Sequence, residues 1–161
     1  MLTNAEKVLT MGLRAGYAGG EAPHAVTRGK FIGKETSISY PDAEYNDQWF
    51  FKRTGGGQDI ARKGDEMATR VFAGGIVKPE ILEKLGIKES DILTYHKSKL
   101  SVLADKTRLH ENVSPEADGD WQYKYEIMRD YPDLPLTIGV EIITYKGNNV
   151  FVHVFLNSPI A

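Results

Sequence analysis

The sequence predicts one α+β domain over residues 1–161, built on a mainly antiparallel, strongly twisted sheet with an N-terminal helix and a central pair of helices. Three observations predict this class. The first residues have the spacing of a helix cap, residues 79–106 have helical periodicity, and residues 121–161 alternate in the way of strands joined by short turns. We expect the N-terminal helix to pack on one side of the sheet and the central helices to pack at its edge or end.

The N-terminal helix is predicted from the capping-box spacing of Thr3 and Glu6, and Gly16 can end it. An apolar stripe follows at helical spacing, and it comprises Ala5, Val8, Leu9, Gly12 and Leu13. Glycine inside a helix costs about 1 kcal/mol relative to alanine. We therefore expect Gly12 to be the point where the helix backbone lies close against the sheet.

The middle of the chain predicts short strands separated by glycines. Residues 17–24 form a loop, and a strand pair follows around Phe31–Tyr40 and Gln48–Arg53. Gly55–Gly57 are interpreted as a mobile hairpin loop, because no Gly-Lys-Ser/Thr ending follows them as phosphate binding would require. Met67–Phe72 is a further short strand.

Two helices are predicted next. Pro79 begins the first, which Gly86 ends, and Ser90 caps a second that runs to about Lys106. This spacing is also that of a helix-turn-helix, so a DNA-binding regulator acting through residues 79–106 is one alternative function. The second helix begins with the acids Glu89 and Asp91, where a recognition helix would meet phosphates, so we disfavour nucleic-acid binding.

His96 lies on the apolar stripe of the second central helix. No second histidine or acid accompanies it at metal-ligand spacing, so it is interpreted as a core or boundary histidine rather than a ligand.

The C-terminal residues 121–161 predict a three-stranded meander. Directly paired residues must point to the same side of a sheet, so this parity excludes a two-residue loop and predicts the three-residue loop 147–149. Tyr145 would then pair with Phe151, and Gly147 or Asn149 would have a positive φ. Glu141 and His153 would be diagonal neighbours, roughly 7–8 Å apart along the backbone.

The alternating face of this meander predicts a semi-polar aromatic pocket that binds a small-molecule ligand or a protein partner, as in a sensor. Its candidate lining comprises Trp121, Tyr123, Tyr125, Glu141, Tyr145, Phe151 and His153. A second candidate rim comprises His24, Arg28, Tyr45, Asp47, Trp49 and Arg53. The same side chains are also compatible with a packed aromatic layer in which buried polar groups satisfy one another.

An enzyme is the other alternative function. Glu141 and His153 would then act as general acid and base, which requires both groups within hydrogen-bond reach of a substrate. We expect Glu141 to raise the pKa of His153 by favouring the imidazolium.

Composition limits the remaining classes. The net charge is −2, from 20 basic and 22 acidic residues without a block of like sign, so bulk attraction to nucleic acid or membranes is not expected. The chain has no cysteine, no close histidine pair and no long apolar run, so we expect no metal, no cofactor and no membrane span. The N-terminus has no basic region followed by an apolar run, and a soluble cytoplasmic protein is expected.

The order of several short motifs resembles a bacterial family known only as a domain of unknown function. These motifs are Arg14-Ala-Gly-Tyr17-Ala-Gly-Gly20, Tyr45 with Asp47 before Gly55–Gly57, Arg70-Val-Phe-Ala-Gly-Gly75 and the final meander. Some members follow a helix-turn-helix regulator domain, so the resemblance implies a sensing or ligand-binding role. This chain has no such separate domain before residue 14, and its segment 79–109 departs from the family pattern.

Overall fold

A single eight-stranded antiparallel sheet organises the protein in the computed structural model, which describes residues 1–161. Its strands are β1 (His24–Arg28), β2 (Phe31–Tyr40), β3 (Ala43–Phe51), β4 (Thr54–Lys63), β5 (Glu66–Ile76), β6 (Trp121–Tyr131), β7 (Leu136–Tyr145) and β8 (Asn148–Ile160). The helices are α1 (Asn4–Ala15), α2 (Pro79–Leu85) and α3 (Glu89–Leu103). The predicted α+β class with an antiparallel sheet is confirmed.

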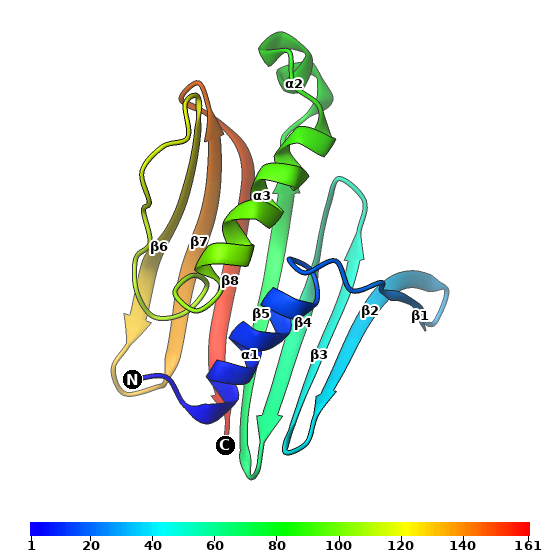
Figure 1. Cartoon of the computed structure of the whole chain (residues 1–161), viewed down its shortest axis with the longest axis vertical. Helices are drawn as coiled ribbons and strands as arrows, with labels where there is room; N and C mark the ends of the chain where they lie inside the picture. The colour runs from blue at the N-terminus through cyan, green and yellow to red at the C-terminus, as the bar shows by residue number, and fades with distance from the viewer.

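The strand order in space is β1-β2-β3-β4-β5-β8-β7-β6. Strands β1 to β5 form one meander, and the C-terminal meander joins it through pairing of β8 with β5. Helices α1 and α3 cross the same face of the sheet, with α2 at one end (Figure 1). We call this the inner face. The prediction that the central helices pack at an edge or end is therefore wrong for α3, whose buried residues Ile92 and Leu100 join the core of the inner face.

Local signals begin and end α1 and α2 as predicted. The Thr3 hydroxyl accepts a hydrogen bond from the Glu6 N–H at 3.2 Å, the Glu6 carboxylate accepts one from the Thr3 N–H at 2.7 Å, and the helix ends at Gly16. Helix α2 starts at Pro79 and ends at Gly86, whose φ is +69°. Helix α3 differs: it starts before Ser90, at Glu89, and ends at Leu103 rather than Lys106.

The N-terminal half of the sheet is more extensive than the sequence predicted. Strand β1 was missed, and β3 begins at Ala43 rather than at Gln48. The interpretation of Gly55–Gly57 as a mobile loop is wrong, because these glycines pair with β3 and β5 inside β4. A Cβ on Gly57 would lie 2.2 Å from the Gln48 carbonyl oxygen and 2.7 Å from the Phe72 ring. Glycine is used here because neighbouring backbone and an aromatic ring approach too closely for a side chain.

The C-terminal hairpin corrects the predicted register. Its loop has two residues, Lys146 (φ +48°) and Gly147 (φ +77°), and Tyr145 pairs with Asn148 rather than with Phe151. A β-bulge at the Ile143/Thr144 step inserts one extra residue in β8. Beyond the bulge, paired residues of β7 and β8 again point to the same side of the sheet, as the two apolar faces require. Glu141 consequently lies directly opposite His153 instead of diagonal to it. The positive φ predicted for Gly147 is confirmed.

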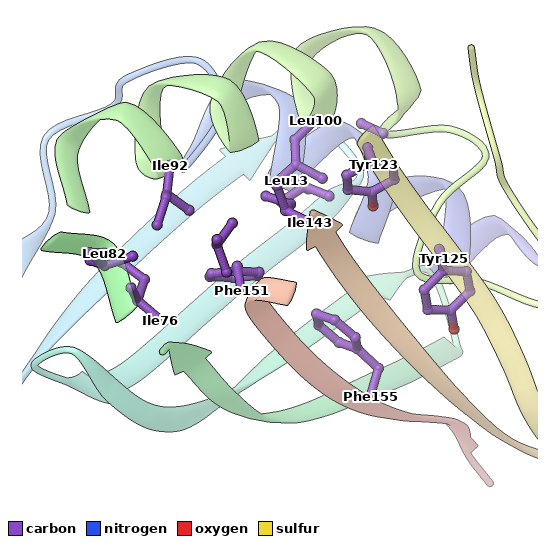
Figure 2. Close-up of a cluster of buried hydrophobic side chains, with 12 residues drawn as sticks. Leu13, Ile76, Leu82, Ile92, Leu100, Tyr123, Tyr125, Ile143, Phe151 and Phe155 are labelled. Atoms are coloured by element: carbon purple, nitrogen blue, oxygen red, sulfur yellow. The ribbon is translucent and has the colours of Figure 1, made fainter. Parts of the chain in front are cut away.

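The main core lies between α3 and the C-terminal half of the sheet. Figure 2 shows its side chains, among them Phe151, Phe155 and Tyr125 from the strands and Leu100 from α3. A second core cluster lies beneath α1, where Leu9 and Val8 pack on Tyr45 and Ala61. The opposite, outer face carries the other aliphatic set of the C-terminal hairpin. These residues are Ile138, Val140, Ile142, Val152, Val154 and Leu156, which are only half-buried or exposed.

Candidate functional site

A cavity of about 440 Å³ lies between the inner face and the helices. Strands β2 to β5 and β8, helix α3 and the loop after α1 all contribute to its lining. Its aromatic walls are Tyr17, Trp49, Phe51, Phe72 and Phe151, and its polar lining includes Thr36, Asp47, Asp59, His96, Arg108 and His153. Apolar walls with a few convergent polar groups are typical of small-molecule sites.

Part of this polar lining belongs to a row that runs across the strands. Thr36 pairs with Asp47, Asp47 with Asp59, and Asp59 with Arg70 in the three successive ladders. Because paired residues of antiparallel strands point to the same side, all four side chains share the inner face. The row continues through Asn157, the partner of Arg70 on β8.

The carboxyl groups of Asp47 and Asp59 differ in their partners. Arg70 Nε donates to Asp59 Oδ2 at 2.8 Å, and its Nη2 contacts the same oxygen. Asp47 is 7% exposed and its Oδ1 has no partner. Burial and the adjacent charge of Asp59 raise the pKa of Asp47 to about 9, despite the more distant arginines. Asp47 is therefore protonated at neutral pH.

A second buried group forms around Glu141, which is 0% exposed. Arg108 Nε and Nη2 donate to its two oxygens at 2.9 and 2.8 Å, and the Tyr123 hydroxyl donates at 2.7 Å. Burial is the largest single influence and opposes ionisation of Glu141, but the charge of Arg108 and the hydrogen bonds from Arg108 and His96 together outweigh it and hold the pKa of Glu141 well below its usual value. Glu141 is thus an ionised carboxylate whose acceptor sites are occupied.

Arg108 reaches this group from the irregular segment after α3. Its backbone has a φ of +61°, a conformation that costs free energy in a residue with a side chain. The guanidinium also lies over the Phe155 ring, 4.6 Å from its centroid. The buried ion pair and this contact hold the strained backbone in place.

His153 lies among aromatic rings rather than in a polar network. The rings of Phe51, Phe72, Phe151 and Phe155 have centroids 4.4–5.8 Å from its own. Neither ring nitrogen has a hydrogen-bond partner, and Nδ1 is 3.8 Å from the nearer oxygen of Glu141. Burial lowers the pKa of His153 to about 3, against the attraction of Glu141. Glu141 favours the imidazolium as expected, but the pKa of His153 is not raised overall, because desolvation dominates and Arg108 already neutralises that carboxylate.

His96 connects Glu141 to the cavity wall. Its Nε2 lies 3.0 Å from Glu141 Oε2, and its Nδ1 lies 3.2 Å from the Tyr17 hydroxyl. Burial lowers the pKa of His96 more than the carboxylate raises it, so the imidazole is neutral. The interpretation of His96 as a bonded core histidine agrees with these contacts, although its ring also reaches the cavity.

The cavity contains few of the residues first predicted to line a pocket. Phe151 and His153 line it. Tyr123 and Tyr125 are fully buried beside it, and the Tyr125 hydroxyl donates to the Leu109 carbonyl. Trp121 lies away from it, in an aromatic group with Tyr95 and Tyr145. Tyr123 and Tyr125 therefore belong to a packed layer, whereas Trp121 and Tyr145 line a separate, more open hollow beside Tyr95.

The second predicted rim and the predicted lining of the C-terminal meander both contribute residues to the same cavity. Asp47 and Trp49 line it beside Phe151 and His153. Tyr45 is buried beneath α1 instead, and His24 and Arg28 are exposed on the edge strand β1. Arg53 contacts the Ile76 carbonyl at 3.4 Å and does not reach the cavity.

Sequence reasoning missed Asp59, Arg70, Arg108 and Tyr17. The sequence does carry a signal for Asp59 and Arg70, because each charge lies on a strand between small or apolar residues two positions away. These neighbours are Gly57 and Ala61 for Asp59, and Ala68 and Phe72 for Arg70. A charge with such neighbours on its face of a strand is expected to be buried and paired. No comparable signal marked Arg108 or Tyr17, which lie in irregular segments.

Comparisons with protein-family models, with curated proteins and with solved structures found no match. The resemblance to a family of unknown function therefore stays a prediction. No group of three or more acids and histidines is arranged to hold a metal ion. No helix has the length and apolar character needed to cross a membrane.

Proposed function

We propose that the protein binds a small organic molecule in the cavity between the inner face and α3. The observation that carries this proposal is the presence of buried polar atoms without partners on its wall. Asp47 Oδ1 and both nitrogens of His153 are such atoms, in residues only 7% and 6% exposed. Buried polar groups in native proteins are nearly always hydrogen-bonded. A ligand that bonds to these atoms explains why they are retained.

The aromatic walls indicate the shape of that molecule. Trp49, Phe51 and Phe72 line the cavity beside the polar atoms. Stacking on such rings favours a flat ligand, and a volume of about 440 Å³ lies within the range of small-molecule sites.

The alternative functions receive less support from the geometry. Glu141 is saturated by Arg108, Tyr123 and His96, so acting as a general base would require breaking a buried ion pair. For DNA binding, α3 would have to use its exposed side, because Ile92, His96 and Leu100 are buried on the other side. The remaining surface of α3 begins with the acids Glu89 and Asp91.

A screen of flat monocyclic and bicyclic aromatic molecules, followed by NMR of the backbone amides, tests the proposal. Leu93 lines the cavity from α3 and is 37% exposed, so the larger ring of Leu93→Trp should occupy part of the cavity. Val102→Trp adds the same ring at an exposed position of the same helix and is the matched control. We expect binding that Leu93→Trp removes and Val102→Trp retains. Absence of any binding molecule, or binding that survives Leu93→Trp, would contradict the proposal.

A further inference from the structure

The buried charges around the cavity do not balance. Three buried carboxyl groups, Asp47, Asp59 and Glu141, face two buried guanidinium groups, Arg70 and Arg108. Arg70 pairs with Asp59, and Arg108 pairs with Glu141. The remaining buried acid of the chain, Glu6, is bound by His110 and does not line the cavity. Asp47 is the acid left without a cation.

The histidines of the cavity do not supply the missing positive charge. Burial lowers the pKa of His96, and it lowers that of His153 to about 3, so both rings are neutral at neutral pH. Without a ligand, Asp47 avoids an uncompensated buried charge by keeping its proton, as its raised pKa of about 9 indicates.

Other charged groups at the cavity lie at its rim. They are Lys34 on β2, Lys52 at the β3–β4 turn, Glu21 after α1, and Glu89 and Lys97 on α3. All five side chains belong to exposed residues, and their charges sum to one net positive charge, which water and salt screen. The buried imbalance at Asp47 therefore dominates the choice of ligand charge.

The walls beside Asp47 suit a cation with an apolar body. Trp49 follows Asp47 by two residues on β3, so both side chains share the inner face, and Phe72 lies across Gly57 in the same ladder row. Aromatic faces attract cations, and tryptophan does so most strongly. A bare metal ion fits less well, because no three acids or histidines converge there.

From this arrangement we propose that the ligand is an organic cation, an ammonium or amidinium on a flat apolar body, whose charged group pairs with Asp47. This inference rests on the proposed ligand-binding function and names its ligand class. Asp47 exchanges its proton for the cation on binding: the O–H bond of the neutral carboxyl group breaks, the proton leaves to the buffer, and the carboxylate forms hydrogen bonds with the ligand N–H groups. Each bound cation thus releases one proton.

Benzamidine and benzamide provide the test, because they share a shape and differ in charge. Isothermal titration calorimetry in two buffers of different ionisation heat measures the protons released by each. We expect benzamidine to bind with release of close to one proton, and its affinity to rise by up to about tenfold per pH unit between pH 6 and 8. Benzamide should bind more weakly and release none.

Two variants test whether Asp47 is the group that binds the cation and releases the proton. Asp47→Asn should weaken benzamidine binding at least about tenfold, the equivalent of a lost charge pair, and should weaken benzamide binding much less. Asp65→Asn removes an exposed carboxylate from the β4–β5 turn and should change neither. Retained benzamide binding shows that the Asp47→Asn cavity is folded. If that variant does not fold, proton release and the pH dependence of the wild type decide the question alone.

Several outcomes would overturn the inference. Equal binding of benzamide and benzamidine, absence of proton release, or benzamidine binding that Asp47→Asn leaves unchanged would each do so. Benzamide binding alone would refute the cation and leave the ligand-binding function standing. If neither molecule binds, the cation inference fails, and the separate comparison of Leu93→Trp with Val102→Trp decides the broader function.

Discussion

Asp47 lies directly opposite Asp59 in the β3–β4 ladder, and both carboxyl groups are buried beneath the cavity. Two carboxylates at such a position would destabilise the sheet, and only Asp59 has an arginine partner, so Asp47 keeps its proton at neutral pH. A pair that works against stability in the unliganded protein is expected at a functional site. The effect of the Asp47–Asp59 pair on the free energy of unfolding can be measured without knowing the ligand.

The first prediction concerns the pH dependence of stability. The pKa of Asp47 is raised to about 9 in the folded chain, so between its unfolded value of about 3.8 and pH 9 the unfolded state loses the proton first. Stability contributed by this group is complete at low pH and is lost as pH rises through that window. Asp47→Asn should raise the free energy of unfolding at pH 7 by roughly 2–4 kcal/mol, discounting the full linkage value.

Urea denaturation at pH 5, 7 and 9 checks this prediction. The increase in the free energy of unfolding caused by Asp47→Asn should grow with pH, whereas Asp65→Asn should leave that free energy nearly unchanged at each pH. A loss of stability in Asp47→Asn that is the same at every pH would show that the carboxyl group is not the destabilising element.

The second prediction concerns the buried pair of Arg108 and Glu141. Arg108→Met should destabilise the protein by about 3–5 kcal/mol, because Glu141 would keep a buried charge without its main partner. Adding Glu141→Gln to Arg108→Met should recover a large part of this loss. Arg14→Met removes an exposed ion pair with Asp105 and should cost at most about 1 kcal/mol.

A double-mutant cycle measured by chemical denaturation gives the coupling energy of the Arg108–Glu141 pair. Additive effects of the two substitutions would mean that the guanidinium does not neutralise Glu141. The pKa of Glu141 would then not be held low by Arg108.

The third prediction contrasts two histidines. His153 has a pKa of about 3 because of burial, so its NMR resonances should remain those of a neutral ring down to pH 5. The hydrogen bond with Glu6 raises the pKa of His110, which should titrate above the ordinary histidine value. The depressed pKa of His153 also removes stability as pH falls below about 6.5, where the unfolded chain binds the proton first. Titration of His153 near its ordinary value would instead indicate that water reaches the ring.

The fourth prediction concerns the contact between α1 and the sheet. A Cβ on Gly12 would lie 2.1 Å from the Tyr45 ring, so the close approach predicted for this glycine is present. Gly12→Ala should gain about 1 kcal/mol of helix propensity and lose more through overpacking, with a net cost of about 1–2 kcal/mol. Combining it with Tyr45→Leu should relieve part of the clash. Thermal denaturation measures both, and a stabilised Gly12→Ala variant would contradict the contact.

Local signals in the sequence predicted the boundaries of α1 and α2 and the strands of the C-terminal meander well. A capping box, a proline at a first turn and a glycine at a helix end act within a few residues, so α1 and α2 follow from short segments. The period-two alternation of residues in β7 and β8 likewise predicted that they are strands and which of their side chains share a face of the sheet. The exact pairing did not follow, because the bulge near Thr144 depends on how β8 packs and no local pattern announces it.

The sequence by itself determined the α+β class, the antiparallel C-terminal meander and the general presence of polar groups among aromatic residues on its inner face. Only the tertiary structure decided which of them form a cavity. It brought Asp47 and Trp49 of β3 beside Phe151 and His153 of β8, about a hundred residues further along the chain, and it buried Glu141 under Arg108. The physical reason is that β4 is a strand in spite of its three glycines, since its neighbours fill the space that side chains would occupy. Such compensation depends on contacts between distant segments, and composition or periodicity alone does not contain it.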